Sequence, residues 1–325
     1  MLLYENALWL LLAALILDGI VGDPDWLWRR LPHPVVWIGK VISALDQTLN
    51  RKDWRPQTRR VTGIVTLLIL LVSSLELGFL VQEFATAIPF GEFLIVVIAA
   101  VLIAQKSLYE HVAAVRIGLL NNGLAGGQQA VAMIVGRDPN SLDEAGVSRA
   151  AIESCAENFS DGIVAPVFWF AVLGLPGLIA YKAVNTADSM IGHKNEMYTD
   201  FGWASARFDD LINLPASRLS GMFLALAAPL AGGSVRKSFS AMVRDAKQHR
   251  SPNAGWPEAA MAGALGLALA GPRTYPGYTV DDPYMNANGR RDATADDISR
   301  GLKVLVGAYG IEAALVLLLA VLFLI

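Results

Sequence analysis

Four long apolar runs in this chain of 325 residues constrain its fold more than any other feature, and they cover residues 4–22, 61–81, 90–108 and 304–325. A helix advances about 1.5 Å per residue, so about 20 apolar residues cross the roughly 30 Å hydrocarbon core of a bilayer. Lipid excludes unpaired backbone polar groups, which favours helices for such runs. The sequence therefore predicts an all-α, polytopic integral membrane protein.

The composition agrees with a membrane protein. Apolar residues make up 54% of the chain and charged residues 17%, with a mean hydropathy of +0.45, which lies on the membrane side of soluble averages. The N-terminal run lacks a basic segment and a small-residue cleavage site, so we interpret it as a retained helix. The single cysteine, Cys155, allows no internal disulfide. A net charge of −3 without a basic stripe argues against a nucleic-acid partner.

Three further apolar pieces, residues 163–181, 221–233 and 261–270, are ambiguous. The first contains Gly174 and Pro176, which suit a broken or re-entrant segment at least as well as a straight span. The other two are short enough to be buried or interfacial helices. We expect one membrane-embedded domain, with residues 109–303 forming mainly a helical body.

The Lys and Arg residues of the loops predict the orientation. Eight of them lie between the first and second runs, whereas residues 82–89 contain none. Cytoplasmic loops retain cations, so the first loop and the body at 109–303 are expected to face the cytoplasm, with the N-terminus outside. The sequence thus predicts a multi-pass protein of the cell (plasma or inner) membrane whose active face is cytoplasmic.

Residues 148–220 concentrate charge in two unlike halves. Glu153, Glu157 and Asp161 are spaced i, i+4, i+8, which places them on one face if a helix runs from Ser148 to Asp161. Carboxylate oxygens at close quarters suit Mg²⁺. The alternative is a solvated acidic face partnered by Arg149.

The second half mixes signs between residues 185 and 210. Its glycines favour an irregular loop in which Lys194 and Arg207 hold phosphate oxygens; an interfacial helix pair joined by salt bridges is the alternative. Asp18, near the end of the first run, is a further functional candidate because a membrane acid is costly. The nucleotide-binding motifs GxxxxGK[ST] and GxGxxG do not occur, so any nucleotide site would be formed by a different set of residues.

Several blocks, in order over about residues 15–285, resemble the adenosylcobinamide-phosphate synthase family of cobalamin biosynthesis (CobD/CbiB type). They read LDGIVGDP with HPVVWIG, IVGRD, SRAAIESCAENFSDGIVAP, YKAVNTADSMIGHKNEMYTDFGWASARFDDLIN and SPNAGWPEAAMAGALG. The resemblance implies an acid-amide ligase that joins aminopropanol or its phosphate to adenosylcobyric acid, a corrinoid, using ATP and Mg²⁺. One departure is the serine in Pro215-Ala216-Ser217-Arg218-Leu219, where we expect P-A-R-L; it leaves the role of Arg218 open.

Residue roles follow from the chemistry that this activity requires. The expected metal ligands are Glu153, Glu157, Asp161 and Asp188. The expected substrate and phosphate ligands are Lys182, Lys194, Arg207, Asn158, Asn185, Asn195, His33 and Asp23. The candidate bases for deprotonating the amine are His193, Asp209 and Asp210.

Membrane lipid is an expected partner, and the sequence leaves open whether the protein forms a homo-oligomer.

Two other functions compete with the ligase. A secondary transporter should contain two similar halves, and the sequence shows none. A membrane sensor or regulatory protein could use the same scaffold, since a related family implicated in β-lactamase induction is similar in outline. The ENFSDG and GHKNE blocks favour the synthase.

Overall fold

The computed structural model describes residues 6–136, 138–275 and 278–323. Helices dominate these residues, and the strands are two or three residues long. The all-α prediction is therefore confirmed. The chain divides into two compact units, which are described separately. Unit 1 comprises Met1–Ala104, Ala165–Asn213 and Val316–Ile325, and unit 2 comprises Gln105–Val164 and Leu214–Leu315.

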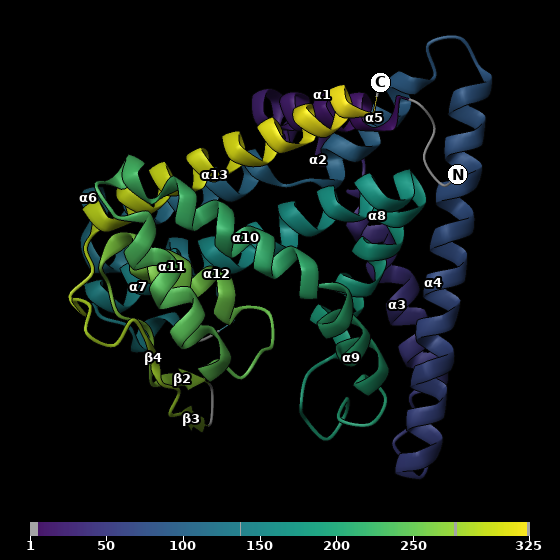
Figure 1. Cartoon of the computed structure of the whole chain (residues 1–325). Helices are drawn as coiled ribbons and strands as arrows, with labels where there is room; N and C mark the ends of the chain where they lie inside the picture. Colours follow the sequence, from purple (N-terminus) through teal and green to yellow (C-terminus); the bar gives the residue numbers. More distant parts are fainter. Residues whose placement is uncertain (1–5, 137, 276–277, 324–325) are drawn as a thin grey trace. The chain divides into compact units, whose positions relative to one another are not determined.

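Unit 1 is a set of packed helices. Its members are α1 (Ala7–Val21), α2 (Asp25–Trp28), α3 (Pro34–Leu49), α4 (Pro56–Ala87), α5 (Glu92–Leu102), α8 (Ala165–Ile191) and α9 (Trp203–Ile212). Helix α8 packs against α4, α3 and α9, and α1 packs against α5 (Figure 1). Helix α8 is thus the element around which the other helices of unit 1 gather.

A break interrupts α8 at Gly174, which has φ 69° and ψ −154°. Residues other than glycine rarely adopt this backbone conformation. The backbone N–H of Leu175, freed by the break, donates to Oε1 of the buried Gln82 on α4 at 3.0 Å. A Cβ on Gly177 would overlap the carbonyl oxygen of Trp169, although residues eight apart in a straight helix are separated by about 12 Å. The apolar segment 163–181 is therefore bent sharply.

Unit 2 contains the remaining helices and the strands. The helices are α6 (Gln105–Val131), η1 (Pro139–Ser141), α7 (Glu144–Phe159), the π-helical turn η2 (Ser160–Val164), α10 (Leu214–Ala227), η3 (Ala228–Ala231), α11 (Val235–Asp245), η4 (Ala246–Gln248), α12 (Gly255–Leu265) and most of α13 (Ala295–Leu322). Helices α10, α11 and α12 pack on one another, and α6 packs on α7 (Figure 1).

Two short antiparallel pairs complete unit 2. Strand β1 (Leu269–Ala270) pairs with β4 (Tyr284–Met285), and β2 (Arg273–Tyr275) pairs with β3 (Tyr278–Val280). These strands were not predicted, because two or three residues are too few to show an alternating pattern.

Five helical segments are long and apolar enough to cross a membrane by length and composition: Pro56–Ala87, Glu92–Val131, Glu144–Ile191, Leu214–Ala231 and Ala295–Leu322, with Ala7–Val21 as a shorter apolar helix. The chain is thus a multi-pass membrane protein. Helix α4 exposes large apolar side chains such as Leu68, Phe79 and Leu80, as a lipid-facing helix does. The number of true spans and the side of the membrane stay predictions.

The other two ambiguous apolar pieces lie on different elements. Residues 221–231 belong to α10 and η3, which begin earlier, at Leu214, and together form one of the five candidate spans; residues 232–233 follow η3. Residues 261–270 cover the end of the buried helix α12 and reach strand β1. The span expected at 90–108 is divided between α5 and α6.

Candidate functional site

The C-terminal end of α8, the loop 192–202 and α9 bring together many of the charged residues that the sequence singled out. Two glycines allow the loop to fold back on the helix. A Cβ on Gly192 would overlap the carboxylate of Asp188, and a Cβ on Gly202 would overlap the carbonyl oxygen of Ile191. These close approaches explain why the loop carries glycine at both positions, and they bring α9 back against α8.

Three aspartates from two helices share this region of unit 1. Asp209 on α9 is buried, and its carboxylate accepts hydrogen bonds from Nδ2 of Asn213 at 2.9 Å and from Nδ2 of Asn185 at 3.4 Å. Burial, reinforced by the charge of Asp188, raises the pKa of Asp209 to about 7, although the two amide hydrogen bonds oppose the shift. Asp188 interacts electrostatically with Asp210 and His193.

Cations lie at the exposed edge of this aspartate cluster, as the residues Asp188, Asp209 and Asp210 are called below. Nη1 of Arg207 lies 3.6 Å from Oδ2 of Asp210. Burial raises the pKa of Asp210, while Arg207 and Lys194 act to lower it. Both cationic side chains are exposed. The site thus combines one buried and two half-buried carboxylates with accessible positive charge, a combination that suits phosphate and metal ligands.

Three further residues predicted for the second half of the charged stretch lie near the aspartate cluster in the sequence. His193 is exposed, and Lys182 is half-buried on α8 one turn before Asn185. Oδ1 of Asn195 accepts from the backbone N–H of Tyr198 at 2.9 Å, so this amide stabilises a turn of the loop.

Arg59 on α4 anchors the same loop and was not predicted. Its guanidinium donates to the carbonyl oxygens of Glu196 and Met197 and, through Nε, to Oδ1 of Asn50 at 2.9 Å. Arg59 is buried. In the sequence it belongs to a cationic cluster that indicated only the topology, so nothing marked it as a partner of the loop.

Asp23 and His33, both predicted to contact substrate, form a small structure of their own. Nε2 of His33 lies 3.7 Å from Oδ1 of Asp23, and the Trp28 indole donates to the same oxygen at 3.2 Å. Nδ1 of His33 accepts from the backbone N–H of Val35 at 3.2 Å and so caps α3. These contacts give both residues a structural role at the start of α3.

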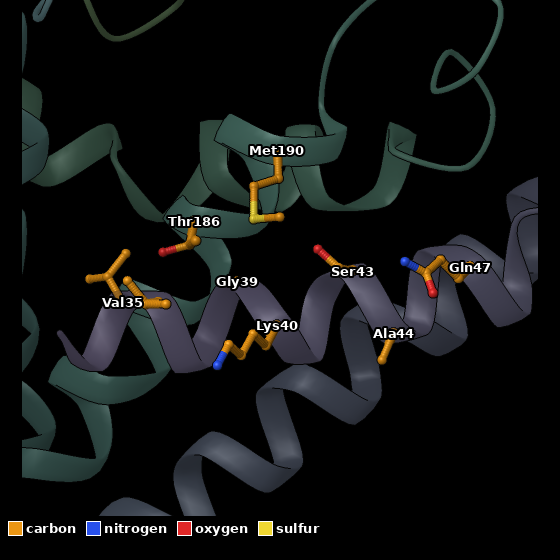
Figure 2. A pocket seen from close by; sticks show the side chains of 9 residues that line it. Val35, Gly39, Lys40, Ser43, Ala44, Gln47, Thr186 and Met190 are labelled. Atoms are coloured by element: carbon orange, nitrogen blue, oxygen red, sulfur yellow. The ribbon is translucent and has the colours of Figure 1, made fainter. Parts of the chain in front are cut away.

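An open groove of about 650 Å³ lies between α3 and the second half of α8 in unit 1. Its lining residues are Val35, Val36, Gly39, Lys40, Ser43, Ala44, Gln47, Thr186 and Met190. Figure 2 shows Thr186 and Met190 of α8 pointing toward Gly39 and Ser43 of α3. Asp188, two residues from each α8 member, lies on another face of this helix, since successive residues turn by about 100°.

The carboxylates of α7 have three different environments in unit 2. Glu153 is buried, and its Oε1 accepts from the backbone N–H of Ala270 at 2.9 Å. Glu157 is exposed, and Asp161 falls in the π-helical turn η2, after the α-helix has ended at Phe159. Nδ2 of Asn158 donates to the carbonyl oxygen of Ser154 at 2.8 Å. Because the helix changes type, the predicted single acidic face does not extend to Asp161.

Within residues 6–136, 138–275 and 278–323, no three His, Cys, Asp or Glu side chains are grouped closely enough to hold a metal ion by themselves. The predicted set is also divided between the units, since Asp188 belongs to unit 1 and the three α7 and η2 acids to unit 2. Magnesium binding by these residues therefore stays a prediction.

Fold and site together define a multi-pass helical membrane protein with a charged polar site. The family described as CobD/Cbib protein matches residues 11–305, and the chain belongs to this family. The cobalamin biosynthesis protein CobD of Sinorhizobium sp is 54% identical over 319 residues, covering 97% of this chain and 99% of that protein. The protein of the same name from Brucella suis biovar 1 is 51% identical over 316 residues, covering 96% and 97%.

A third relative, a cobalamin biosynthesis protein CobD of Rhodobacter capsulatus, is 46% identical over 293 residues, covering 90% of this chain and 91% of that protein. No solved structure matches the chain. The resemblance found in the sequence blocks is thereby confirmed at the level of the family.

Proposed function

We propose that the protein acts in cobalamin biosynthesis as an adenosylcobinamide-phosphate synthase. It would form an amide between a propionate carboxylate of adenosylcobyric acid and the amine of aminopropanol or its phosphate, at the expense of Mg-ATP. Family membership and the names of the relatives support the pathway. The structural observation that supports the chemistry is the aspartate cluster, with one carboxyl of pKa about 7 and two cations at its edge.

The donors of the cluster fit magnesium. Like charges gathered in a partly buried site repel, and a divalent cation would relieve that repulsion. Mg²⁺ is usually held by one or two carboxylates, with water and substrate phosphates completing its coordination, so fewer than three protein ligands suffice. Asp188 and Asp210 would hold the ion, which would neutralise the charge on the phosphates of ATP. Glu153, Glu157 and Asp161 are the alternative ligands.

The proposed reaction has two steps. A carboxylate oxygen of the corrinoid attacks a phosphorus of ATP and displaces ADP or pyrophosphate, because a free carboxylate is a poor electrophile. The amine nitrogen then attacks the activated carbonyl carbon; the C–N bond forms and the C–O bond to the phosphate or adenylate breaks. Lys194 and Arg207 would hold the negative charge of the transferred and leaving groups.

The attacking amine must first lose the proton of its ammonium form. A base with a pKa near the working pH is both unprotonated and strong enough to take that proton. Asp209 has this property, and Asn185 and Asn213 fix the orientation of its carboxylate. His193 and Asp210 remain the alternative bases.

The groove on α3 and α8 is a suitable site for part of the corrinoid. Its lining is mainly apolar, with the hydroxyls of Ser43 and Thr186, the amide of Gln47 and the ammonium group of Lys40 as polar groups. A corrinoid is large and amphipathic, and concave, mostly apolar sites with a few polar groups are typical of such ligands. The groove and the aspartate cluster share α8, so one helix would connect corrinoid binding with the reacting groups.

The test is a reconstitution. Purified protein is incubated with adenosylcobyric acid, aminopropanol phosphate and Mg-ATP, and the products are separated and identified. We expect an amide-linked corrinoid and a stoichiometric amount of ADP or AMP. Binding of the substrates without any amide product would count against the ligase.

A further inference from the structure

Among the described residues, Arg218 in unit 2 has only neutral partners, as does Arg149, which donates to the carbonyl oxygen of Arg291. Four other arginines of the unit contact an aspartate carboxylate. These pairs are Arg244 with Asp245 at 2.6 Å, Arg250 with Asp282 at 2.7 Å, and Arg290 and Arg300 with Asp297 at 2.6 and 2.9 Å. In the described part of the chain Arg218 makes no ion pair, although it is only half exposed.

Neutral groups hold Arg218 by one end of its guanidinium. Nη1 donates to the carbonyl oxygen of Leu214 at 3.1 Å, to Oγ of Ser217 at 2.8 Å and to Oδ1 of Asn253 at 3.0 Å. Ser217 and Asn253 are buried and also bond to each other, at 3.1 Å. The ring of Trp256 lies 4.7 Å from the guanidinium carbon. The plane of the guanidinium is thus fixed from one edge and one face.

This arrangement leaves the opposite edge of the Arg218 guanidinium available to a ligand. Among the described residues, no hydrogen-bond acceptor contacts Nε or Nη2 of Arg218. These two groups form the fork that binds a phosphate or carboxylate with two parallel hydrogen bonds. A partly desolvated cation without a counter-ion is unfavourable, so a bound anion would complete the site.

The location favours phosphate among the anions. Arg218 lies about one turn inside the candidate span that begins at Leu214. At the end of a helix that crosses a membrane, lipid headgroups supply phosphate, and phosphorylated metabolites reach the same level from the water. We propose that Arg218 binds a phosphate group through Nε and Nη2, with Ser217, Asn253 and Trp256 as positioning residues. The proposed binding does not depend on amide formation, but the choice of ATP and aminopropanol phosphate as probes rests on the proposed function.

The serine that departs from the expected family pattern gains a role here. Ser217 supplies one of the three acceptors of Arg218 and, through its own hydrogen bond, also orients the Asn253 amide. Ser217, whose presence left the role of Arg218 open in the sequence, therefore helps to hold the guanidinium of Arg218 in the structure.

The test measures binding to the full-length protein in detergent. In one arm, ATP and aminopropanol phosphate are titrated separately by equilibrium dialysis. In the other, retention of phosphatidylglycerol is measured by native mass spectrometry. We expect Arg218→Lys to weaken one of these ligands about tenfold, because the fork is lost while the charge remains. Arg218→Gln should weaken it further. Arg236→Gln, which changes an exposed arginine of the same unit, should have no effect.

Asn253→Asp separates binding from a merely structural role. It keeps Arg218 but gives that side chain a carboxylate partner of nearly the same shape. Competition from this carboxylate should weaken the phosphate ligand about as much as Arg218→Lys does, with an unchanged melting temperature. The arm that responds identifies the source of the phosphate. The proposal is overturned if wild-type protein binds none of the three ligands, or if Arg218→Gln or Asn253→Asp binds them all like wild type.

Discussion

The acids of α7 and those of α8 and α9 look similar in the sequence but have different surroundings in the structure. On α7, the buried carboxylate of Glu153 accepts a backbone N–H from β1, and Glu157 faces outward. On α8 and α9, Asp188 and Asp209 lie close enough for one charge to raise the pKa of the other carboxyl. The comparison teaches that carboxylates which satisfy a backbone group serve the fold, whereas mutually repelling carboxylates are the better candidates for chemistry.

Removal of the Asp188 charge should have the largest effect on activity and would test the difference between the two groups of acids most strongly. Asp188→Asn keeps the size of the side chain and removes a proposed magnesium ligand. We expect the rate of amide formation to fall at least about 100-fold, since electrostatic groups of this kind are worth such factors. Glu196→Gln, an exposed carboxylate of the neighbouring loop, is the matched control and should stay active. Full activity of Asp188→Asn would show that the aspartate cluster does not take part in the reaction as proposed.

The pH dependence of the reaction tests the role of Asp209. With a pKa of about 7, a base on Asp209 should make kcat/KM rise with pH up to about 7 and then level off. Asp209→Asn should lower kcat/KM by a factor on the order of 100 to 10,000 and remove this rise. In Asp210→Asn the rise should occur at lower pH, because one negative charge that raises the pKa of Asp209 is gone. An unchanged pH profile of kcat/KM in Asp209→Asn would show that another residue is the base.

The same carboxyl should affect stability with a defined sign. The pKa of Asp209 is about 7 in the folded protein, against an ordinary value of 3.8. The folded state therefore binds the proton more tightly than the unfolded state, and the contribution of Asp209 to stability falls as pH rises from about 4 to about 7. Melting temperatures of wild type should decline more over this range than those of Asp209→Asn. Equal slopes for the two proteins would contradict the raised pKa.

Glu153 should affect stability rather than activity. Glu153→Ala leaves the backbone N–H of Ala270 without its acceptor in a buried place, which costs about 1–3 kcal/mol of unfolding free energy. Glu153→Gln retains an oxygen and should cost less. The exposed Glu157→Gln is the control, with an expected change within about 0.5 kcal/mol. Loss of amide formation in a stable Glu153→Gln protein would move the proposed magnesium site to α7.

The smallest effect is expected at the break in α8. Gln82→Ala removes the acceptor of the Leu175 N–H and should lower the unfolding free energy by about 1 kcal/mol, or somewhat more if no water replaces the amide. The activity of the folded fraction should be retained, because Gln82 supports the bend and is not a member of the aspartate cluster. Denaturant titration of the protein in detergent measures the change. A large loss of activity without a loss of stability would give Gln82 a role in the reaction.

The helical membrane class could be predicted because it depends on local properties of the chain. Long apolar runs indicate helices in lipid. Gly174 and Pro176 suited a broken segment within 163–181 at least as well as a straight span, and the structure places a break at Gly174. The strands of unit 2 and the π-helical turn η2 could not be predicted. The strands are too short to show an alternating pattern. The turn η2 contacts α10, which is distant in the sequence, and it moved Asp161 out of the α-helical register on which the acidic face depended.

The site was predictable as a list of residues, not as a set of contacts. Asp188, Asp209 and Asp210 were all named from the charge density of one stretch, but nothing in their spacing shows that α9 folds back on α8. Arg59 was missed for the same reason, since its loop partners are more than 130 residues away in the chain. Residue type therefore indicated the candidate residues, whereas tertiary contacts were needed to distinguish the environment of Glu153 from that of Asp209.

The decisive measurement compares three proteins in one reconstituted assay: wild type, Asp188→Asn and Glu153→Gln. Each is supplied with adenosylcobyric acid, aminopropanol phosphate and Mg-ATP, and the amide-linked corrinoid is quantified per folded molecule. We predict product from wild type and Glu153→Gln and almost none from Asp188→Asn. Product from Asp188→Asn at the wild-type rate, or its loss in Glu153→Gln alone, would contradict the assignment of the chemistry to the aspartate cluster.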